Sequence, residues 1–452
     1  MAPDDNVARA IREKFRFTAA AKLRQRMVAC ASAAQRQFQG RGHSLIALII
    51  AKELRHNLFS YKFSIVTVLS TVLILASTYI MYRDYCLARD NYEILRSESE
   101  KDVAVIAPTP LSIFARGLDE NLCRSFEVGG IDIGVSEKQQ SVNEIFKLFT
   151  APDLFYIIKV ILSLCAMLFA FDMVSGEKET GTLRQSLSGS LARPILIIGK
   201  WVGGFTSFIL PFLIAVLLST IFVTLSPNVS MSTQDWAKLG LFLISSAVYL
   251  AVFFSLGLLI SCLTHQSSLS LVISLFVWTI LVFVIPNLGV VLARQLVRMP
   301  TVQQLELRRM YNRRKARFER DRAEGLERHR IEQRAETEAD QLTEEYRNRF
   351  NRLAMISQSI TRISPAAAFT FLATDTMGTG MAEERRLKRA VLQYNYATRN
   401  WRAGSRPAFR YQRSSCREAL GPGGLGNLLI LVLFGILSGT GAYVAFLRYD
   451  VR

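Results

Sequence analysis

Six separated apolar blocks, each close to the roughly 20 residues that an α-helix needs to cross a bilayer, dominate this sequence of 452 residues. Half of the residues are hydrophobic, and their concentration in blocks of this length excludes an ordinary soluble enzyme and an intrinsically disordered chain. The sequence therefore predicts an all-α membrane protein with six transmembrane helices. The blocks are Phe63–Tyr82, Leu154–Met173, Gly203–Leu225, Leu239–Leu263, Leu269–Leu292 and Leu425–Leu447.

Three residues inside these blocks depart from a plain apolar helix. Pro211 and Pro286 lie in the third and fifth blocks and predict kinks, because proline removes a helical hydrogen bond that neighbouring groups must replace. Lys159 is the only Lys or Arg well inside a block, and its long side chain can reach toward the membrane interface.

The orientation follows from Lys and Arg in the short loops, which favour the cytoplasmic side. These residues precede the first block and fill the loop 174–202, so the sequence predicts that both termini and this loop are cytoplasmic. The expected location is the inner membrane of a bacterium. The predicted divisions are a basic segment 1–42, an interfacial amphipathic helix 43–62, spans one to five over 63–292 with an outer loop 83–153, an outer insertion 293–424, and the sixth span with its cytoplasmic tail, 425–452.

The charge distribution bears on nucleic-acid binding. The chain has a formal net charge of +18, but much of the excess lies in a predicted outer segment. Residues 293–420 hold 27 Lys/Arg against 15 Asp/Glu, whereas residues 83–150 hold 8 against 12. Because the largest basic block is predicted outside the cytoplasm, the sequence argues against a nucleic-acid partner.

The outer insertion contains a long helical pattern. Thr301–Ser357 has no proline and one glycine, Gly325, and is rich in good helix formers. Such a helix would reach about 85 Å at 1.5 Å per residue, so it projects outward or folds back near Gly325. Together with a shorter helix predicted over Met381–Trp401, it predicts an antiparallel hairpin or coiled coil. Its apolar stripe is Ile331, Ala335, Ala339, Leu342, Tyr346, Phe350 and Leu353.

The sequence offers few candidates for other chemistry. Cys86, Cys123 and Cys416 lie in the predicted outer segments, where disulfides persist, and Cys86–Cys123 is the nearest possible pair. No phosphate-binding GxxxxGK[ST], HExxH or GxSxG motif occurs, so no catalytic or metal residue is predicted and the chain is not expected to be an enzyme.

The most informative segment is the loop after the second span, which reads SGEKETGTL over Ser175–Leu183 and continues to Arg193, Gly199 and Lys200. This pattern resembles the permeases of type-2 ABC transporters. A second match, KEL at Lys52, Glu53 and Leu54, precedes the first span. The outer phrases APTPLSIFARG and RISPAAAFTFLATDTMGTG resemble a subgroup with large external insertions, similar to permeases for multicopper-enzyme maturation.

The resemblance implies a transmembrane subunit that couples ATP hydrolysis by a separate ATPase to export, or to mechanical work on an envelope partner. ATP and Mg²⁺ would bind the ATPase, not this chain, and two copies of the chain would form a homodimer. The residues implied to contact the ATPase are Glu177, Lys178, Glu179, Gly181, Thr182, Leu183, Arg184, Lys52 and Glu53. The alternative is a membrane-anchored coiled-coil scaffold without an ATPase.

Overall fold

The computed structural model describes residues 46–98, 103–104, 106–117, 126–127, 152–188, 192–398, 409 and 411–449. Helices dominate this part of the chain, and its strands are one antiparallel pair of two residues each, β1 (Val103–Ala104) and β2 (Phe126–Glu127). The all-α prediction is confirmed. Within the described residues, six helices are long and apolar enough to cross a membrane: Tyr61–Ile94, Leu154–Glu179, Arg193–Leu225, Thr233–Leu263, Ser267–Leu296 and Gly423–Leu447.

The spans are built from single helices or from helices joined by a π-helical turn. Spans one, three, four and six are α2 (Tyr61–Glu98), α9 (Arg193–Leu225), α10 (Thr233–Leu263) and α18 (Pro422–Leu447). Span two comprises α5 (Leu154–Tyr156), the π-turn η2 (Ile157–Leu162) and α6 (Ser163–Ala170). Span five comprises α11 (Ser267–Thr279), the π-turn η3 (Ile280–Val284) and α12 (Ile285–Leu296).

Two helices extend beyond their predicted apolar blocks by ten residues or more. α2 continues to Glu98, so the outer loop predicted from Arg83 begins as helix. Residues 83–98 contain no glycine or proline, and the Arg89–Glu93 pair at i,i+4 supports the helix at its exposed side. α9 begins at Arg193, ten residues before the predicted block, because Pro194 occupies its first turn, where proline is favoured.

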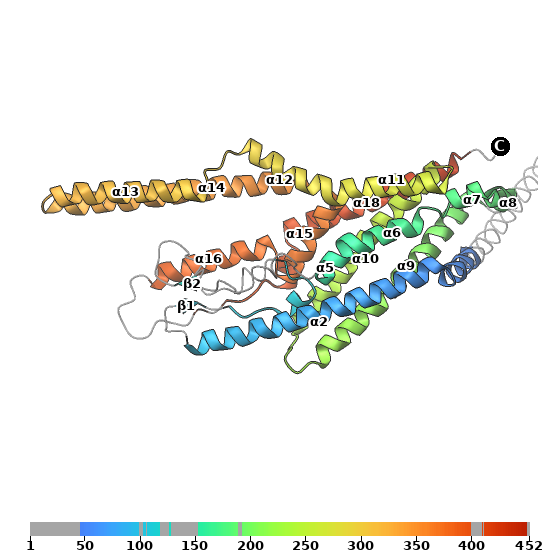
Figure 1. Cartoon of the computed structure of the whole chain (residues 1–452), viewed down its shortest axis with the longest axis horizontal. Helices are drawn as coiled ribbons and strands as arrows, with labels where there is room; N and C mark the ends of the chain where they lie inside the picture. Colours follow the sequence, from blue (N-terminus) through green and yellow to red (C-terminus); the bar gives the residue numbers. More distant parts are fainter. Residues whose placement is uncertain are drawn as a thin grey trace, which may run out of the picture.

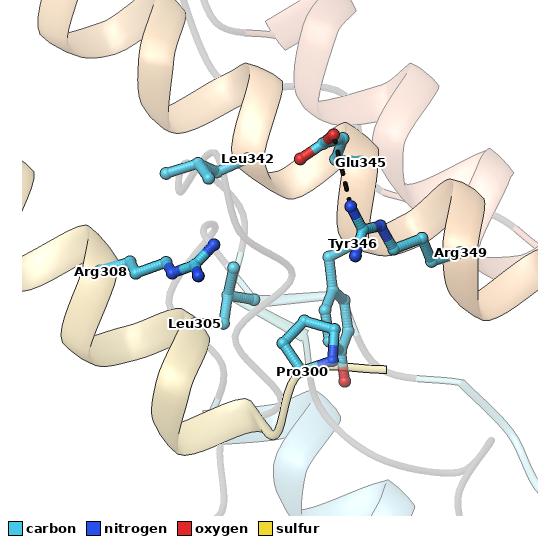
Figure 2. Close-up of a pocket in the computed structure, with 7 residues that line it drawn as sticks. All are labelled: Pro300, Leu305, Arg308, Leu342, Glu345, Tyr346 and Arg349. Carbon is cyan, nitrogen blue, oxygen red and sulfur yellow. Dashed lines mark ion pairs between the residues drawn. The ribbon is translucent and has the colours of Figure 1, made fainter. Parts of the chain in front are cut away.

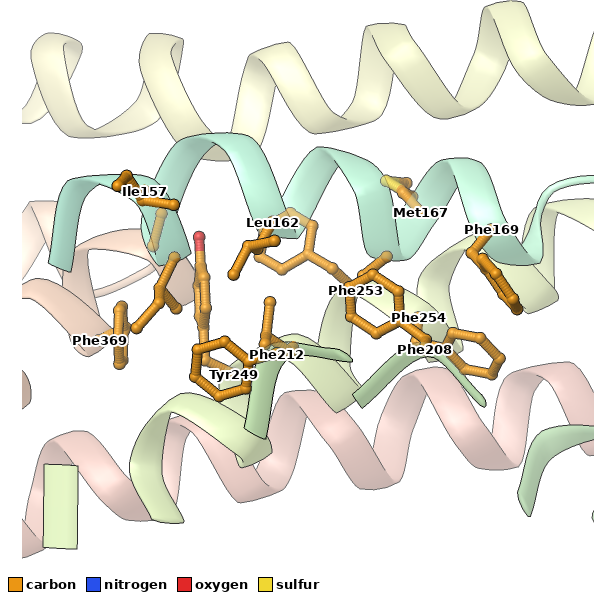
Figure 3. Close-up of a cluster of buried hydrophobic side chains, with 14 of the residues drawn as sticks. Ile157, Leu162, Met167, Phe169, Phe208, Phe212, Tyr249, Phe253, Phe254 and Phe369 are labelled. Atoms are coloured by element: carbon orange, nitrogen blue, oxygen red, sulfur yellow. The ribbon is translucent and has the colours of Figure 1, made fainter. Parts of the chain in front are cut away.

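The core of the bundle lies around α10, which packs most extensively against α18, α6 and α15 (Pro365–Met377). Its Tyr249 ring stacks on Phe369 of α15 with the ring centroids 4.3 Å apart and the planes 12° from parallel. Figure 3 shows this pair at one end of a row of buried aromatic side chains that continues through Phe253 and Phe254 to Phe208. α15 therefore belongs to the core.

Backbone carbonyl groups in both π-turns accept hydrogen bonds from side chains of other segments. The Tyr249 hydroxyl donates to the Lys159 carbonyl at 2.8 Å, and the Ser364 hydroxyl donates to the Leu281 carbonyl. In η2 the Lys159 ammonium lies 5.8 Å from the centre of the Phe155 ring. η3 directly precedes Pro286, whereas α9 continues unbroken through Pro211.

The long helical pattern forms two helices, α13 (Val302–Arg322) and α14 (Leu326–Thr361), which pack on each other as a hairpin that extends away from the bundle (Figure 1). The chain reverses at Gly325, whose φ of 56° favours glycine, so the predicted fold-back point is confirmed. Figure 2 shows the base of the hairpin, where Leu305 and Leu342 face each other. Which side of the membrane holds the hairpin stays a prediction.

A cap of polypeptide covers the end of the bundle opposite α7 (Ser175–Glu179) and α8 (Thr182–Ser188). It contains η1 (Pro110–Ile113), the end of α15, α16 (Met381–Thr398) and α17 (Cys416–Ala419). The segments 107–117 and 362–380, which carry the two motifs of the predicted outer loops, meet here. A Cβ atom at Gly117 would lie 2.6 Å from the Thr379 hydroxyl. α16 confirms a predicted helix, whereas the sequence did not predict α15.

Buried carboxyl groups hold this cap. Glu383 is buried and accepts hydrogen bonds from the Tyr411 hydroxyl at 2.8 Å and from the backbone N–H of Ser414 at 3.2 Å. Burial raises the pKa of Asp375, although the backbone N–H of Ala382 partly offsets this effect. Burial likewise raises the pKa of Asp153, the N-cap of α5.

The predicted disulfide is not tested, since Cys123 lies outside the described residues. Its suggested partner, Cys86, is a free, half-buried thiol on α2. The basic segment 1–42 also lies outside the described residues.

Candidate functional site

A helix over 46–58, which falls within the predicted interfacial helix 43–62, lies across the start of α9 (Figure 1). Two glycines one helical turn apart allow this close approach. A Cβ atom at Gly199 would lie 2.6 Å from Ile49, and one at Gly203 would lie 2.8 Å from the Cβ of Glu53. Small residues at this spacing let helix backbones pack closely in membrane proteins.

A buried ion cluster fixes the same contact. The Lys200 ammonium of α9 donates to Glu177 at 2.6 Å and to Glu53 at 3.2 Å, and its third donor reaches the Met173 carbonyl at 3.3 Å. The side chains of Lys200 and Glu53 are only 3% and 8% exposed. The cluster therefore joins three segments that are far apart in the sequence: 46–58, α7 and α9.

Lys178 joins α7 to the end of span four. Its ammonium donates to the carbonyl groups of Cys262 and, at 2.9 Å, Thr264, where α10 ends. A cation near a helix C-terminus interacts favourably with the helix dipole and with carbonyls that lack helical partners. The same ammonium lies 4.7 Å from the centre of the Tyr449 ring, just after α18.

Glu179 joins α7 to the beginning of span five. Its carboxylate accepts hydrogen bonds from the backbone N–H and the hydroxyl of Ser267, at 3.1 and 2.8 Å. Ser267 is the first residue of α11, so a negative charge lies at a helix N-terminus, where the dipole favours it.

Two further contacts complete the arrangement. The Ser261 hydroxyl of α10 accepts from the backbone N–H groups of Val174 and Ser175, at 3.0 and 2.9 Å. Arg193, at the start of α9, donates to the carbonyl groups of Leu447 and Tyr449, each at 3.1 Å. The ends of α9, α10, α11 and α18 and the helix 46–58 thus meet around α7, a group that we call the α7 junction.

α8 lies next to the α7 junction and exposes most of its surface. Gly181, with a φ of 73°, forms the turn between α7 and α8, and the side chain of Leu183 in α8 is fully buried. Thr182, Arg184 and Gln185 are exposed. The helix 46–58 adds a groove of about 690 Å³ that is lined by Leu48, Ala51, Lys52, Arg55, His56, Phe59 and Ser60.

The structure separates the predicted contact residues into two groups. Lys52, Gly181, Thr182 and Arg184 are exposed, whereas Leu183 is buried. Glu53, Glu177, Lys178 and Glu179 form ion pairs or hydrogen bonds within the chain, although Glu179 is also exposed. That these four residues contact an ATPase stays a prediction. The sequence pattern could not identify Lys200, Thr264 and Ser267 as their partners, because these residues are distant in the chain.

The comparison with known families agrees with this architecture. The family model described as "ABC-2 family transporter protein" matches residues 47–451, nearly the whole chain.

The chain belongs to the ABC-2 family of transporter proteins.

A relative in Stutzerimonas stutzeri, the probable ABC transporter permease protein NosY, is 31% identical over 125 residues. The matched segment covers 27% of this chain and 45% of the relative, so the similarity spans less than half the length of that protein. This ABC-2 protein is therefore a multi-pass membrane protein and a transmembrane subunit of an ABC transporter. The family indicates a subunit without enzymatic activity of its own.

Proposed function

We propose that this ABC-2 subunit couples ATP hydrolysis by a separate ATPase to export or to mechanical work on an envelope partner. The ATPase, which would hold ATP and Mg²⁺, docks on α8 and on the groove of the helix 46–58. Two copies of the chain form the working permease. The α7 junction and both termini then face the cytoplasm, and the membrane is the inner membrane of a bacterium.

The observation that carries the proposal is the position of α8 beside the α7 junction. α8 presents exposed polar residues, and only the Gly181 turn separates it from α7. α7 in turn holds the end of α10 through Lys178, the start of α11 through Glu179 and the start of α9 through Glu177. A displacement of α8 would therefore reach three spans directly.

The kind of contact suits the transmission of force. Hydrogen bonds to charged groups are directional and stronger than bonds between neutral groups, typically about 1.5–3 kcal/mol each. A sliding apolar contact could absorb a small displacement, whereas these bonds have to move with their helices or break. The α7 junction therefore moves the helix ends together.

The experiment compares variants of the docking surface with variants of the α7 junction. Arg184→Glu combined with Lys52→Glu reverses two exposed charges and should lower the amount of ATPase that co-purifies by at least about tenfold, since charge reversal at an interface costs several kcal/mol. Lys178→Met keeps the length of the side chain but removes its bonds to the end of α10. The Lys178→Met variant should still co-purify with the ATPase. The rate of ATP hydrolysis should, however, no longer depend on this subunit.

The exposed Ser188→Ala provides the matched control on α8 and should behave as the wild type. The proposal is contradicted if the double charge reversal leaves ATPase association unchanged. It is also contradicted if Lys178→Met leaves both association and coupled ATP hydrolysis unchanged.

A further inference from the structure

The outward face of α13 carries its large apolar side chains. Leu307, Tyr311 and Phe318 are 61%, 68% and 61% exposed, and Met310 is 50% exposed. Among the α13 side chains whose burial the structure describes, the half-buried ones are instead Leu305, Arg309, Asn312 and Ala316. An amphipathic helix normally has the opposite arrangement, with its large apolar residues in the buried contact.

Helical geometry places these two sets on opposite sides of α13. At about 100° per residue, Leu307, Tyr311 and Phe318 lie within about 40° of one line along the helix, whereas Leu305 and Ala316 lie roughly on the far side. We call the face formed by Leu307, Met310, Tyr311 and Phe318 the apolar strip. It is about 16 Å long at 1.5 Å per residue, which matches three turns of a partner helix.

Lipid tails do not explain the strip. Span five, Ser267–Leu296, has 30 residues and reaches about 45 Å, longer than the roughly 30 Å hydrocarbon layer, and α13 begins beyond its end. The hairpin continues along the long axis of the molecule, past the end of α16 (Figure 1). A helix in this direction does not lie flat on a membrane surface.

Charge determines which protein surface fits the strip. α13 contains eight Lys or Arg residues and three acidic ones, a net charge of +5. Arg314 lies within the strip by helical position, and the guanidinium of Arg322 lies 4.1 Å from the centre of the Phe318 ring. A second copy would bring two such basic helices together, and like charges in contact cost several kcal/mol. An acidic partner neutralises the same groups.

We propose that the apolar strip binds an acidic amphipathic helix of an extracytoplasmic partner protein. The apolar side of that helix would cover Leu307, Tyr311 and Phe318, and its flanking carboxylates would face Arg314 and Arg322. This inference rests on the outer location of the hairpin and the envelope partner in the proposed function, and it specifies the surface and the chemistry of that partner.

The test uses the full-length chain in lipid nanodiscs and a fluorescent helical peptide of three heptads with leucines on one face and glutamates on the others. Binding is measured by fluorescence anisotropy. The combined variant Leu307→Ser, Tyr311→Ser and Phe318→Ser should weaken binding by at least about tenfold, because a few central aromatic and apolar residues dominate such interfaces. A peptide with lysines in place of the glutamates should bind at least about tenfold more weakly than the acidic one.

The matched control places the same kind of change elsewhere on the hairpin. Leu326, Phe350 and Met355 are exposed residues of α14, and their combined replacement by serine should alter binding less than twofold. Circular dichroism should show that both triple variants keep the helical content of the wild type.

Three results overturn the proposal: no binding of the acidic peptide, equal binding of the lysine peptide, or equal loss in the two triple variants. A photo-crosslinker at position 318 that joins two copies of this chain in cells also overturns it. Because the peptide assay contains no ATPase, its failure leaves the proposed coupling role untouched.

Discussion

Replacing Lys200 by methionine should be among the most destabilising changes at the α7 junction. The substitution keeps the length and much of the volume of the side chain but removes its charge. It leaves the carboxylates of Glu53 and Glu177 facing the same site without their shared cation. Both acidic residues would then repel each other in a site that water barely reaches.

The magnitude follows from burial. Removing one partner of a buried ion pair typically costs about 3–5 kcal/mol, and Lys200 and Glu53 are only 3% and 8% exposed. The Lys62–Asp172 pair provides the comparison, because its side chains are 43% and 31% exposed. Lys62→Met should therefore cost only about 0–1 kcal/mol.

Unfolding of the chain in mixed micelles by increasing SDS, followed by circular dichroism, measures both changes. A triple variant that adds Glu53→Gln and Glu177→Gln to Lys200→Met removes all three charges and should be more stable than Lys200→Met alone. Equal losses for Lys200→Met and Lys62→Met would refute the reasoning. So would a triple variant no more stable than the single one.

Three other changes test the topology, the packing and the electrostatics. An impermeant thiol reagent should label Glu319→Cys and Glu344→Cys in intact cells but label Thr182→Cys only after lysis, and the reverse pattern would invert the orientation. Gly203→Val should displace the helix 46–58 and lower the thermal midpoint, whereas Gly240→Val, where a Cβ meets nothing within 4 Å, should not. Burial raises the pKa of Asp375, so its protonation favours the native state and stability is lost as the pH rises from about 4 through the raised pKa. Asp375→Asn should therefore raise the thermal midpoint above that of the wild type by more at pH 8 than at pH 5. An increase that is the same at both pH values, or larger at pH 5, would contradict the burial argument.

The sequence predicted the elements whose signals are local. Continuous apolar composition identified all six spans, and the 3–4 residue spacing identified the side of α14 that packs in the hairpin. Ile331, Ala335, Ala339, Leu342 and Tyr346 are half-buried as predicted. Phe350, in the same stripe, is 48% exposed, because periodicity alone does not show where the partner helix ends.

α15 was missed although its boundaries carried usable signals. Ser364 is its N-cap, Pro365 occupies its first turn, and Gly378 ends it with a φ of 69°. These are ordinary helix start and stop residues. Its alanine-rich sequence gave no sign that Phe369 would stack against Tyr249 in the centre of the bundle, because that contact joins residues 120 positions apart.

The candidate site shows the same limit. The resemblance identified the segment from Ser175 to Leu183 and pointed to Lys200. The resemblance did not show which charged residues are only exposed and which ones hold helix ends together. That distinction depends on the end of α10 and the start of α11, more than 80 residues further along the chain.

The most direct test of the account is purification of the tagged full-length chain from its own membranes in mild detergent, followed by quantification of bound proteins and ATP hydrolysis. The account predicts that an ATPase without membrane spans co-purifies in a fixed ratio and that the preparation hydrolyses ATP. It also predicts that the double variant Arg184→Glu and Lys52→Glu loses both. A wild-type chain that purifies, folded and intact, without an ATPase would contradict the coupling role and favour a membrane-anchored scaffold.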